Sequence, residues 1–298
     1  MPFKLILQLS VRNLFRYPRR NGLLLTAIAF ALAGATLTNS LMRGWQYDML
    51  DRAVENLVGH VKVQASEYRD DPNMAHSFVL PANYEPEISG AEVAGWAPRI
   101  KVPAVILSER QSRGVQLVGI DPARENISFF SELAFAGETL ADKDDGRIVI
   151  GAELARQLQT AVGRKLVVLS QGADGKNRER GFRIAGTFDA DGTSLEKAFA
   201  FTGLTSTQAF LGDRSSDSPR PLVTEVSVLL ADELRRNDAV TELRAAFPDK
   251  DVADWRALQP QVAEMFAMAD VAIYIIFGLM MGGLAFGLVN TLIAAVME

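Results

Sequence analysis

The side chains that most often perform catalysis are scarce in this sequence. The 298 residues contain two histidines, His60 and His76, and no cysteine. Neither histidine stands in the His-Glu-x-x-His spacing that binds zinc, and no Gly-x-Ser-x-Gly turn could hold a serine nucleophile. The lack of cysteine excludes disulfides, thiolate metal sites and a cysteine nucleophile. We expect His60, beside a predicted strand, to be a surface or edge residue.

Two further groups of residues resemble binding sites but lack the required spacing. The carboxylates Asp142, Asp144 and Asp145 are not accompanied by the glycine that a calcium loop needs at its sixth position. The segment 172–177 resembles a phosphate loop, but Asn177 replaces the Ser or Thr that must follow the lysine. We therefore predict a solvated loop at the carboxylates and a turn at the tip of a hairpin at 172–177. We predict no catalytic, cofactor-binding or metal-binding residues in this chain. ATP hydrolysis is expected in a separate protein.

Charge is distributed unevenly along the chain, and its distribution predicts two membrane-spanning helices. All 67 charged side chains lie outside two stretches, residues 22–41 and 271–297. Because a helix rises about 1.5 Å per residue, 20 residues suffice to cross a bilayer core of about 30 Å. Buried core helices are the alternative, but uncharged core helices of this length are rare. The formal net charge of −5 argues against a nucleic-acid partner.

The basic residues before the first apolar stretch predict its orientation. Residues 1–20 hold five basic and no acidic side chains, so the positive-inside rule places the N-terminus in the cytoplasm and residues 42–270 across the membrane. The same residues have the pattern of a basic amphipathic helix on the membrane surface, with a helix continuous with the span as the alternative. We expect an uncleaved anchor, although Ala31 and Ala33 resemble a signal-peptidase site.

The segment between the two spans predicts an α+β domain with a helix at each end. Its strand-rich middle, residues 116–221, is interpreted as an insertion between flanking elements. Apolar runs and alternation predict strands at 59–65, 102–107, 115–120, 147–150, 165–169, 181–187, 198–201, 223–230 and 251–255. Helices are expected at 42–57, 152–159, 205–211 and 232–246, and from Pro260 into the second span.

The second span carries a packing signal. Gly278 and Gly282 are four residues apart, as are Gly283 and Gly287. Small residues at this spacing let helix backbones approach closely, so we expect the span to pack against another helix, with a merely glycine-rich helix as the alternative. The uncharged polar residues of the spans, among them Thr36, suit hydrogen bonds between helices better than an ion path.

Several short motifs follow one another along nearly the whole chain. They are Leu9-Ser10-Val11-Arg12-Asn13-Leu14, Gly59-His60-Val61-Lys62-Val63, Val118-Gly119-Ile120-Asp121-Pro122, Ile148-Val149-Ile150-Gly151-Ala152-Glu153-Leu154-Ala155, Ile184-Ala185-Gly186-Thr187-Phe188, Ala253-Asp254-Trp255 and Asn290-Thr291-Leu292. In this order and spacing they resemble the permease subunits of ABC transporters in the FtsX/MacB-type superfamily. The resemblance is greatest to lipoprotein-releasing permeases of the LolC/LolE type.

The resemblance implies a membrane protein in which two transmembrane α-helices flank an α+β extracytoplasmic domain. That domain would consist of a Porter-like subdomain with an inserted, strand-rich Sabre-like subdomain. The expected boundaries are a cytoplasmic basic amphipathic helix at 1–20, transmembrane helix 1 at 21–42, the Porter-like subdomain at 43–115 and 222–265, the Sabre-like subdomain at 116–221, and a stalk with transmembrane helix 2 at 266–298. Members of this family have four spans, so two further transmembrane helices are expected to be missing from this chain.

The resemblance also implies partners and a location. The chain would be a non-catalytic permease subunit in the bacterial inner membrane, with its N-terminus in the cytoplasm and residues 42–270 in the periplasm. Its implied partners are cytoplasmic ABC ATPase subunits that bind ATP and Mg, a second permease subunit, membrane lipids, a lipoprotein and a periplasmic carrier. The tip at 172–178 differs from the Pro-rich hook with which LolC-type permeases capture the carrier, because it is short, polar and without proline.

We predict that the chain transmits ATP-driven motion to its periplasmic domain and releases lipoproteins from the inner membrane. Apolar residues near the membrane are expected to contact acyl chains, and packing of the two helical ends on each other is the alternative. These residues are Met42, Met49, Leu50, Val262, Met265, Phe266 and Met268. Two rival functions are a two-span extracytoplasmic sensor or receptor and a mechanical activator of periplasmic cell-wall enzymes.

Overall fold

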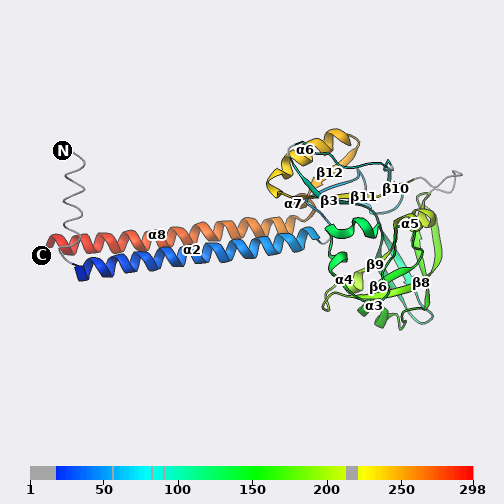
Figure 1. Cartoon of the computed structure of the whole chain (residues 1–298), viewed down its shortest axis with the longest axis horizontal. Coiled ribbons are helices and arrows are strands. Elements are labelled where there is room, and N and C mark those ends of the chain that lie inside the picture. The colour runs from blue at the N-terminus through cyan, green and yellow to red at the C-terminus, as the bar shows by residue number, and fades with distance from the viewer. Residues whose placement is uncertain (1–17, 56, 82, 90, 213–220, 298) are drawn as a thin grey trace. The chain divides into compact units, whose positions relative to one another are not determined.

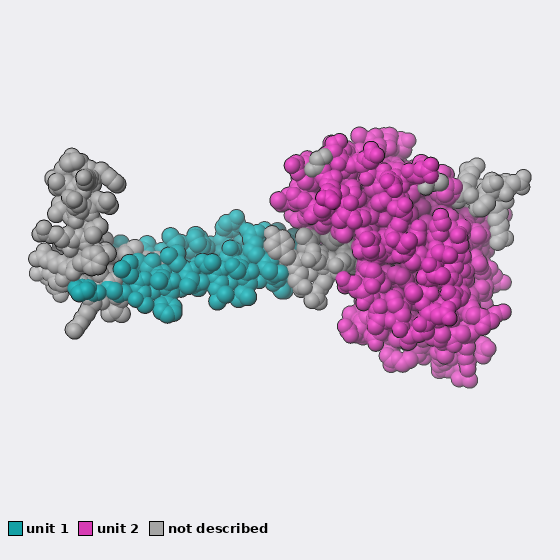
Figure 2. Space-filling view, viewed as in Figure 1, with its two compact units in different colours: residues 1–51, 260–298 teal, residues 52–259 magenta. Residues whose placement is uncertain are grey.

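A computed structural model describes all residues except 1–17, 56, 82, 90, 213–220 and 298. The chain forms two compact units, one of residues 1–51 with 260–298 and one of residues 52–259 (Figure 2). We call them unit 1 and unit 2. Most of the basic amphipathic helix predicted at 1–20 lies outside the described residues, so it stays a prediction.

Unit 1 is built from two long helices, α2 (Pro18–Glu55) and α8 (Pro260–Met297) (Figure 1). Within them, Leu25–Gln46 and Pro260–Gly287 are long and apolar enough to cross a membrane. Large apolar side chains such as Phe30, Leu279 and Phe286 are more than 70% exposed, as expected of helices that are apolar on every face and contact lipid. Both predicted spans therefore fall in helices that qualify by length and composition.

Unit 2 is an α+β unit around a ten-stranded mixed sheet. The strands of that sheet are β1 (Val61–Ala65), β3 (Val93–Leu107), β4 (Ser112–Ile120), β5 (Ala134–Gly137), β6 (Ile148–Gly151), β7 (Lys165–Gln171), β8 (Asn177–Asp189), β9 (Phe199–Gly203), β11 (Glu225–Leu230) and β12 (Lys250–Asp254). A separate pair is formed by β2 (Phe78–Val79) and β10 (Leu222–Val223). The helices are α3 (Ala152–Gln157), α4 (Leu195–Ala198), α5 (Leu204–Leu211), α6 (Arg236–Ala246) and α7 (Trp255–Leu258), with short 3-10 turns η1 (Pro122–Ile127), η2 (Phe129–Glu132) and η3 (Glu233–Arg235).

Strand β3 is shared by two parts of the sheet. Its first half, up to Arg99, pairs with β11, which in turn pairs with β1 and β12. Its second half, from Ile100, pairs with β4 on one side and with β7 on the other. Strands β4, β9, β6, β8 and β7 then pair in sequence, so the ring of strands closes on β3 as a six-stranded barrel. Within this ring, β4 with β9 and β6 with β8 are parallel.

The core of unit 2 follows from strand alternation. Alternate residues of β3 and β7, such as Ile106 and Val168, are fully buried inside the barrel, while their neighbours Leu107 and Val167 are partly exposed. A second cluster covers part of the barrel's outer side with packed aromatic rings. Its rings come from Phe129, Phe130, Phe135, Phe188, Phe199 and Phe201.

Most predicted strands and helices are confirmed, with shifted ends. Strand β3 begins at Val93, well before the predicted start, and the β7–β8 turn shrinks to residues 172–176 because both strands extend into the predicted polar tip. Strand β5 and the turns η1 and η2 were not predicted, because elements of four to six residues carry little periodicity. The α+β class and the mixed sheet agree with the expected fold class, whereas the division into Porter-like and Sabre-like subdomains stays a prediction.

One glycine of β8 should be intolerant of any side chain. A Cβ at Gly186 would collide with the carbonyl oxygen of Glu138 and lie 2.9 Å from that of Ala136 on β5, and neither backbone atom can rotate away. We expect Gly186→Ala to lower the free energy of unfolding by about 1–3 kcal/mol, measured by urea unfolding of the detergent-solubilised chain. Gly181→Ala on the same strand is the control, since its Cβ meets nothing within 4 Å. Equal effects of the two substitutions would contradict the close approach of β5.

Candidate functional site

The first candidate site is a cleft of about 320 Å³ between α2 and α8, which we call the interhelical cleft. Gln46 of α2 contacts Asp270 of α8, and Gly34 of α2 faces Met280 of α8, so the two helices run antiparallel. Most of the lining is apolar. The lining residues are Leu32, Ala35, Thr36, Thr38, Asn39, Arg43, Asp270, Ile273, Tyr274, Ile276, Phe277 and Met280.

One end of the interhelical cleft is polar. The Nε2 of Gln46 donates a hydrogen bond to Oδ1 of Asp270 over 3.1 Å, and Gln46 is buried. Arg43 and Asp270 both line this end. A hydrogen bond between helices in apolar surroundings fixes their relative register. The cleft can therefore accept an apolar chain along its length and a polar group at one end.

The hydroxyl of Thr36 donates a hydrogen bond within its own helix. It donates to the carbonyl oxygen of Leu32 in its own helix over 2.9 Å, rather than to a group on α8. This bond to the residue four positions earlier is always within reach in a helix, so it competes with interhelical partners. The hydroxyl oxygen can still accept a hydrogen bond, so bonding of Thr36 to another helix stays a prediction.

The predicted acyl-contact residues lie outside the interhelical cleft. Met42, Met49, Val262 and Phe266 are half-buried, Met265 and Met268 are exposed, and the side chain of Leu50 lies outside the described residues. Their role stays a prediction. The sequence could have indicated Ile273, Tyr274 and Phe277 instead, because with Asp270 they follow the three- and four-residue spacing of one helix face.

The predicted glycine pairs do not supply the close approach of α2 and α8 that the described residues show. A Cβ added at Gly278, Gly282 or Gly283 would meet nothing within 4 Å among the described residues. The contact between α2 and α8 uses larger side chains such as Phe277 and Met280. Packing of these pairs, including Gly283 with Gly287, against another helix stays a prediction.

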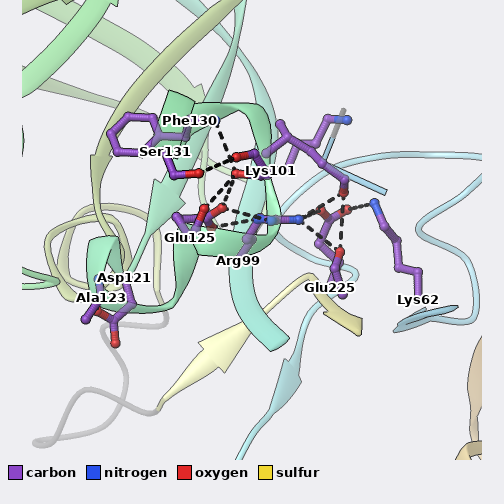
Figure 3. A network of polar contacts seen from close by, with 12 residues as sticks. Lys62, Arg99, Lys101, Asp121, Ala123, Glu125, Phe130, Ser131 and Glu225 are labelled. Atoms are coloured by element: carbon purple, nitrogen blue, oxygen red, sulfur yellow. Dashed lines mark hydrogen bonds and ion pairs between the residues drawn. The ribbon is translucent and has the colours of Figure 1, made fainter. Parts of the chain in front are cut away.

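The second candidate site is a group of charged side chains buried inside unit 2, which we call the Arg99 network. Arg99 of β3 is 0% exposed and Glu125 of η1 is 1% exposed. The guanidinium donates from Nε to Oε1 of Glu125 over 2.7 Å and from Nη2 to Oε2 over 2.8 Å (Figure 3). This two-bond geometry is the strongest form of an arginine–carboxylate pair.

The third nitrogen of Arg99 connects the network to the end of α2. Its Nη1 donates to the carbonyl oxygen of Leu57 and to Oγ of Ser227 on β11, both over 2.9 Å. Leu57 lies two residues after the end of α2, is fully buried, and has a positive φ of 63°. A non-glycine residue in this conformation is strained and is held there by its surroundings. Arg99 and the buried leucine side chain supply that constraint.

Two further charges complete the network. The Nζ of Lys62 on β1 lies 2.9 Å from Oε2 of Glu225 on β11, and both residues are buried (Figure 3). Burial lowers the pKa of Lys62 to about 8, although the charge of Glu225 acts in the opposite direction. Burial would raise the pKa of Glu225, but Lys62, Lys101 and Arg99 outweigh it and hold that pKa below its ordinary value.

The chain leading to α8 is anchored by a different set of residues. Trp255 opens α7, is 1% exposed, and its backbone N–H donates to the carbonyl oxygen of His60 over 3.1 Å. The Nε1 of Trp255 donates to Oε1 of Glu233 over 3.2 Å. His60 is itself buried, and its Nδ1 accepts a hydrogen bond from the backbone N–H of Leu230. The expectation that His60 is a surface or edge residue is therefore wrong. His60 directly precedes β1, which pairs with β11 along one edge and with β12 along the other.

The sequence did not single out the Arg99 network. Lys62 and Glu225 each stand beside apolar residues of predicted strands, and Arg99 precedes an apolar run. A charged residue inside a strand that is buried on both faces is unusual and needs a partner. That rule could have marked the residues as a set, but not which carboxylate pairs with which cation.

Comparisons with known proteins match this chain to one family model and to solved structures. Residues 22–246 match the model of the MacB-like periplasmic core domain. The fold resembles the periplasmic region of MacB from Actinobacillus actinomycetemcomitans, with 9% identity, a TM-score of 0.41, and coverage of 68% of this chain and 92% of that one. It also resembles the extracellular domain of the noncanonic ABC-type transporter YknZ from Gram-positive bacteria, with 12% identity, a TM-score of 0.40, and coverage of 65% and 100%. No curated protein matches the sequence.

Removing Glu125 should destabilise unit 2 strongly. Glu125→Ala leaves the Arg99 guanidinium buried without its carboxylate, which should lower the free energy of unfolding by about 3–5 kcal/mol. The measurement is urea unfolding of the detergent-solubilised chain followed by tryptophan fluorescence. Asp238→Asn is the matched control, since its ion pair with Arg235 is about half exposed on both sides and should cost less than about 1 kcal/mol. A loss as small as the control's would contradict the network's structural role.

The Lys62 pKa predicts an unusual dependence of stability on pH. Lys62 has a pKa of about 8 in the folded chain and an ordinary value of 10.5 when unfolded, so the unfolded chain binds more protons between these values. The free energy of unfolding should therefore rise as the pH increases from about 8 to about 9.5, and Lys62→Met should abolish the rise. Burial raises the pKa of Tyr68, so above pH 10 this tyrosine lowers the free energy of unfolding as the pH increases. The pH range of the experiment therefore ends below pH 10. Equal pH slopes in both proteins would contradict the assignment.

Proposed function

Because the chain belongs to the family with a MacB-like periplasmic core domain, which fits a permease-type component of an ABC transporter, we propose that it is the permease subunit of a lipoprotein-releasing transporter. In this proposal, the first and second apolar helices anchor it in the bacterial inner membrane and unit 2 lies in the periplasm. ATP and Mg²⁺ are bound by separate cytoplasmic ATPase subunits. A second permease subunit completes the membrane part.

The observation that carries the proposal is the extent of the family match. It begins at residue 22, inside α2, and continues to residue 246, at the end of α6. The match therefore includes a helix that is long and apolar enough to span a membrane as well as most of the sheet of unit 2. A domain of this kind joined to such a helix suits a permease better than a freely diffusing binding protein.

The interhelical cleft supports a lipid-modified cargo. Its walls are mainly Ile273, Ile276, Phe277 and other apolar side chains, which suit a hydrocarbon chain. Its polar end, at Arg43 and Asp270, suits the polar linkage that joins an acyl chain to protein. The predicted contact residues, such as Met265 and Met268, would then meet a chain before it enters the cleft.

The Arg99 network supports the transmission of motion. Helix α2 continues through residues 52–55 of unit 2, and the carbonyl of Leu57 is held by Arg99 two residues later. The same guanidinium binds η1 through Glu125 and β11 through Ser227. A displacement of the end of α2 is therefore passed to the barrel side and to the β1–β11–β12 side together.

Photocrosslinking in cells tests whether the interhelical cleft receives lipoprotein. A benzophenone side chain at Phe277, which lines the cleft, should crosslink lipoprotein several-fold more than the same group at Phe286. Phe286 is the matched control because it lies on the same helix, is 75% exposed and does not line the cleft.

Equal yields at the two positions, or no lipoprotein at Phe277, would reject the cargo assignment. The turnover of the co-purified ATPase gives a second readout of the same variants. Stimulation by added lipoprotein supports release, whereas a turnover that responds only to cell-wall enzymes indicates a mechanical activator.

A further inference from the structure

One end of the barrel carries a group of basic side chains that the proposed function does not use. We call Arg110, Arg113, Arg164, Lys165 and Arg183 the basic cluster. Arg110 lies in the β3–β4 turn and Arg113 at the start of β4. Arg164 and Lys165 lie at the start of β7, and Arg183 lies on β8, where it pairs with Lys165. The cluster stands out because residues 52–259 hold 25 basic and 31 acidic side chains.

Three of the five cations in the basic cluster are positioned by hydrogen bonds to uncharged groups. Arg110 Nη1 donates to Oε1 of Gln159 over 3.4 Å, and Arg113 Nε donates to Oε1 of Gln157 over 3.2 Å. Arg183 Nη1 donates to the carbonyl oxygen of Gly163 over 3.0 Å. All three acceptors are uncharged, so they orient the cations without cancelling their charge.

The basic cluster differs from other arginines of unit 2 in its lack of carboxylate partners among the described residues. Arg147 is held by two carboxylates, Asp145 and Glu138. Within the part of the chain that the structure describes, no member of the basic cluster forms an ion pair. Arginine and lysine side chains without a carboxylate partner can form charge-assisted hydrogen bonds with an anion from outside the chain.

Three members of the cluster line one small pocket. Arg110, Arg164 and Lys165 border a hollow of about 190 Å³, together with Ser108, Glu109, Gln159 and Thr160. The turn that carries Arg110 is braced, because Ser108 Oγ donates to the carbonyl oxygen of Leu158 just after α3. Gln159 has a positive φ of 51°, so the pocket wall is held in a strained conformation.

We propose that this pocket binds the phosphate group of a phosphate ester. Three cations and one carboxylate leave a local charge of +2. This charge balances a phosphate monoester, and it also suits a phosphodiester, whose free oxygens can each accept from a separate cation. The guanidinium and ammonium groups can each donate to a different phosphate oxygen, and the hydroxyl of Thr160 offers a further donor. The ester belongs either to the headgroup of an anionic lipid or to a soluble molecule.

Titration calorimetry of the full chain in a non-ionic detergent tests the proposal. The probes are inorganic phosphate, dihexanoyl phosphatidylglycerol and dihexanoyl phosphatidylcholine. Wild type should bind at least one of the first two, and Arg110→Gln with Lys165→Gln should weaken that binding by at least about tenfold, since each variant side chain loses a charge-assisted hydrogen bond. The matched control is Lys176→Gln with Lys197→Gln, which removes the same charge from exposed lysines that do not line the pocket. It should change the affinity by less than about twofold.

The pattern of affinities identifies the source of the phosphate. Tighter binding of phosphatidylglycerol than of inorganic phosphate, with no binding of phosphatidylcholine, supports a lipid headgroup. Equal binding of phosphatidylglycerol and inorganic phosphate supports a soluble phosphate ester. Absence of binding to wild type, or the same loss of affinity in both double variants, overturns the proposal. The pocket lies outside the interhelical cleft, so these outcomes do not depend on whether lipoprotein is the cargo.

Discussion

The buried guanidinium of Arg99 is the constraint on which the arrangement of unit 2 depends. A charge with no exposure must be paired and fully hydrogen-bonded, or it costs several kcal/mol. Glu125, Ser227 and the carbonyl of Leu57 meet that requirement from three separate segments. The planar fork of arginine can bind all three in fixed directions, which the single ammonium of a lysine could not do. These segments therefore keep their mutual positions or lose the network together.

The two parts of the sheet share this constraint through one strand. Arg99 stands where β3 stops pairing with β11 and begins to pair with β4. The barrel on one side and the β1–β11–β12 group on the other are therefore joined both by continuous backbone and by a buried ion pair. Such a double connection favours movement of unit 2 as one body.

Local pattern in the sequence located most of the strands and helices, but it did not show which of them pair or pack together. Bare apolar stretches located α2 and α8, and alternation located strands such as β1 and β7, because both signals lie within a few residues. Closure of the barrel depends on pairings such as β4 with β9, and the Arg99 network joins residues as far apart as Lys62 and Glu225. The interhelical cleft was missed for the same reason, since its lining depends on which helix faces meet. Contacts of this range have no signature in one sequence.

The pairing of β1 with β12 has a consequence for how unit 2 bears load. The chain enters β1 shortly after α2 and leaves β12 directly before α7, and Val61 lies opposite Asp254 at this end of the ladder. Forces that spread these two chain ends would open the ladder one hydrogen bond at a time, like a zipper, instead of shearing all of them at once. The bond from Trp255 to the carbonyl of His60 is the first that such a tear would meet. Leu57, which is fully buried, precedes β1 at this end of the ladder, and Trp255, which is 1% exposed, follows β12 there.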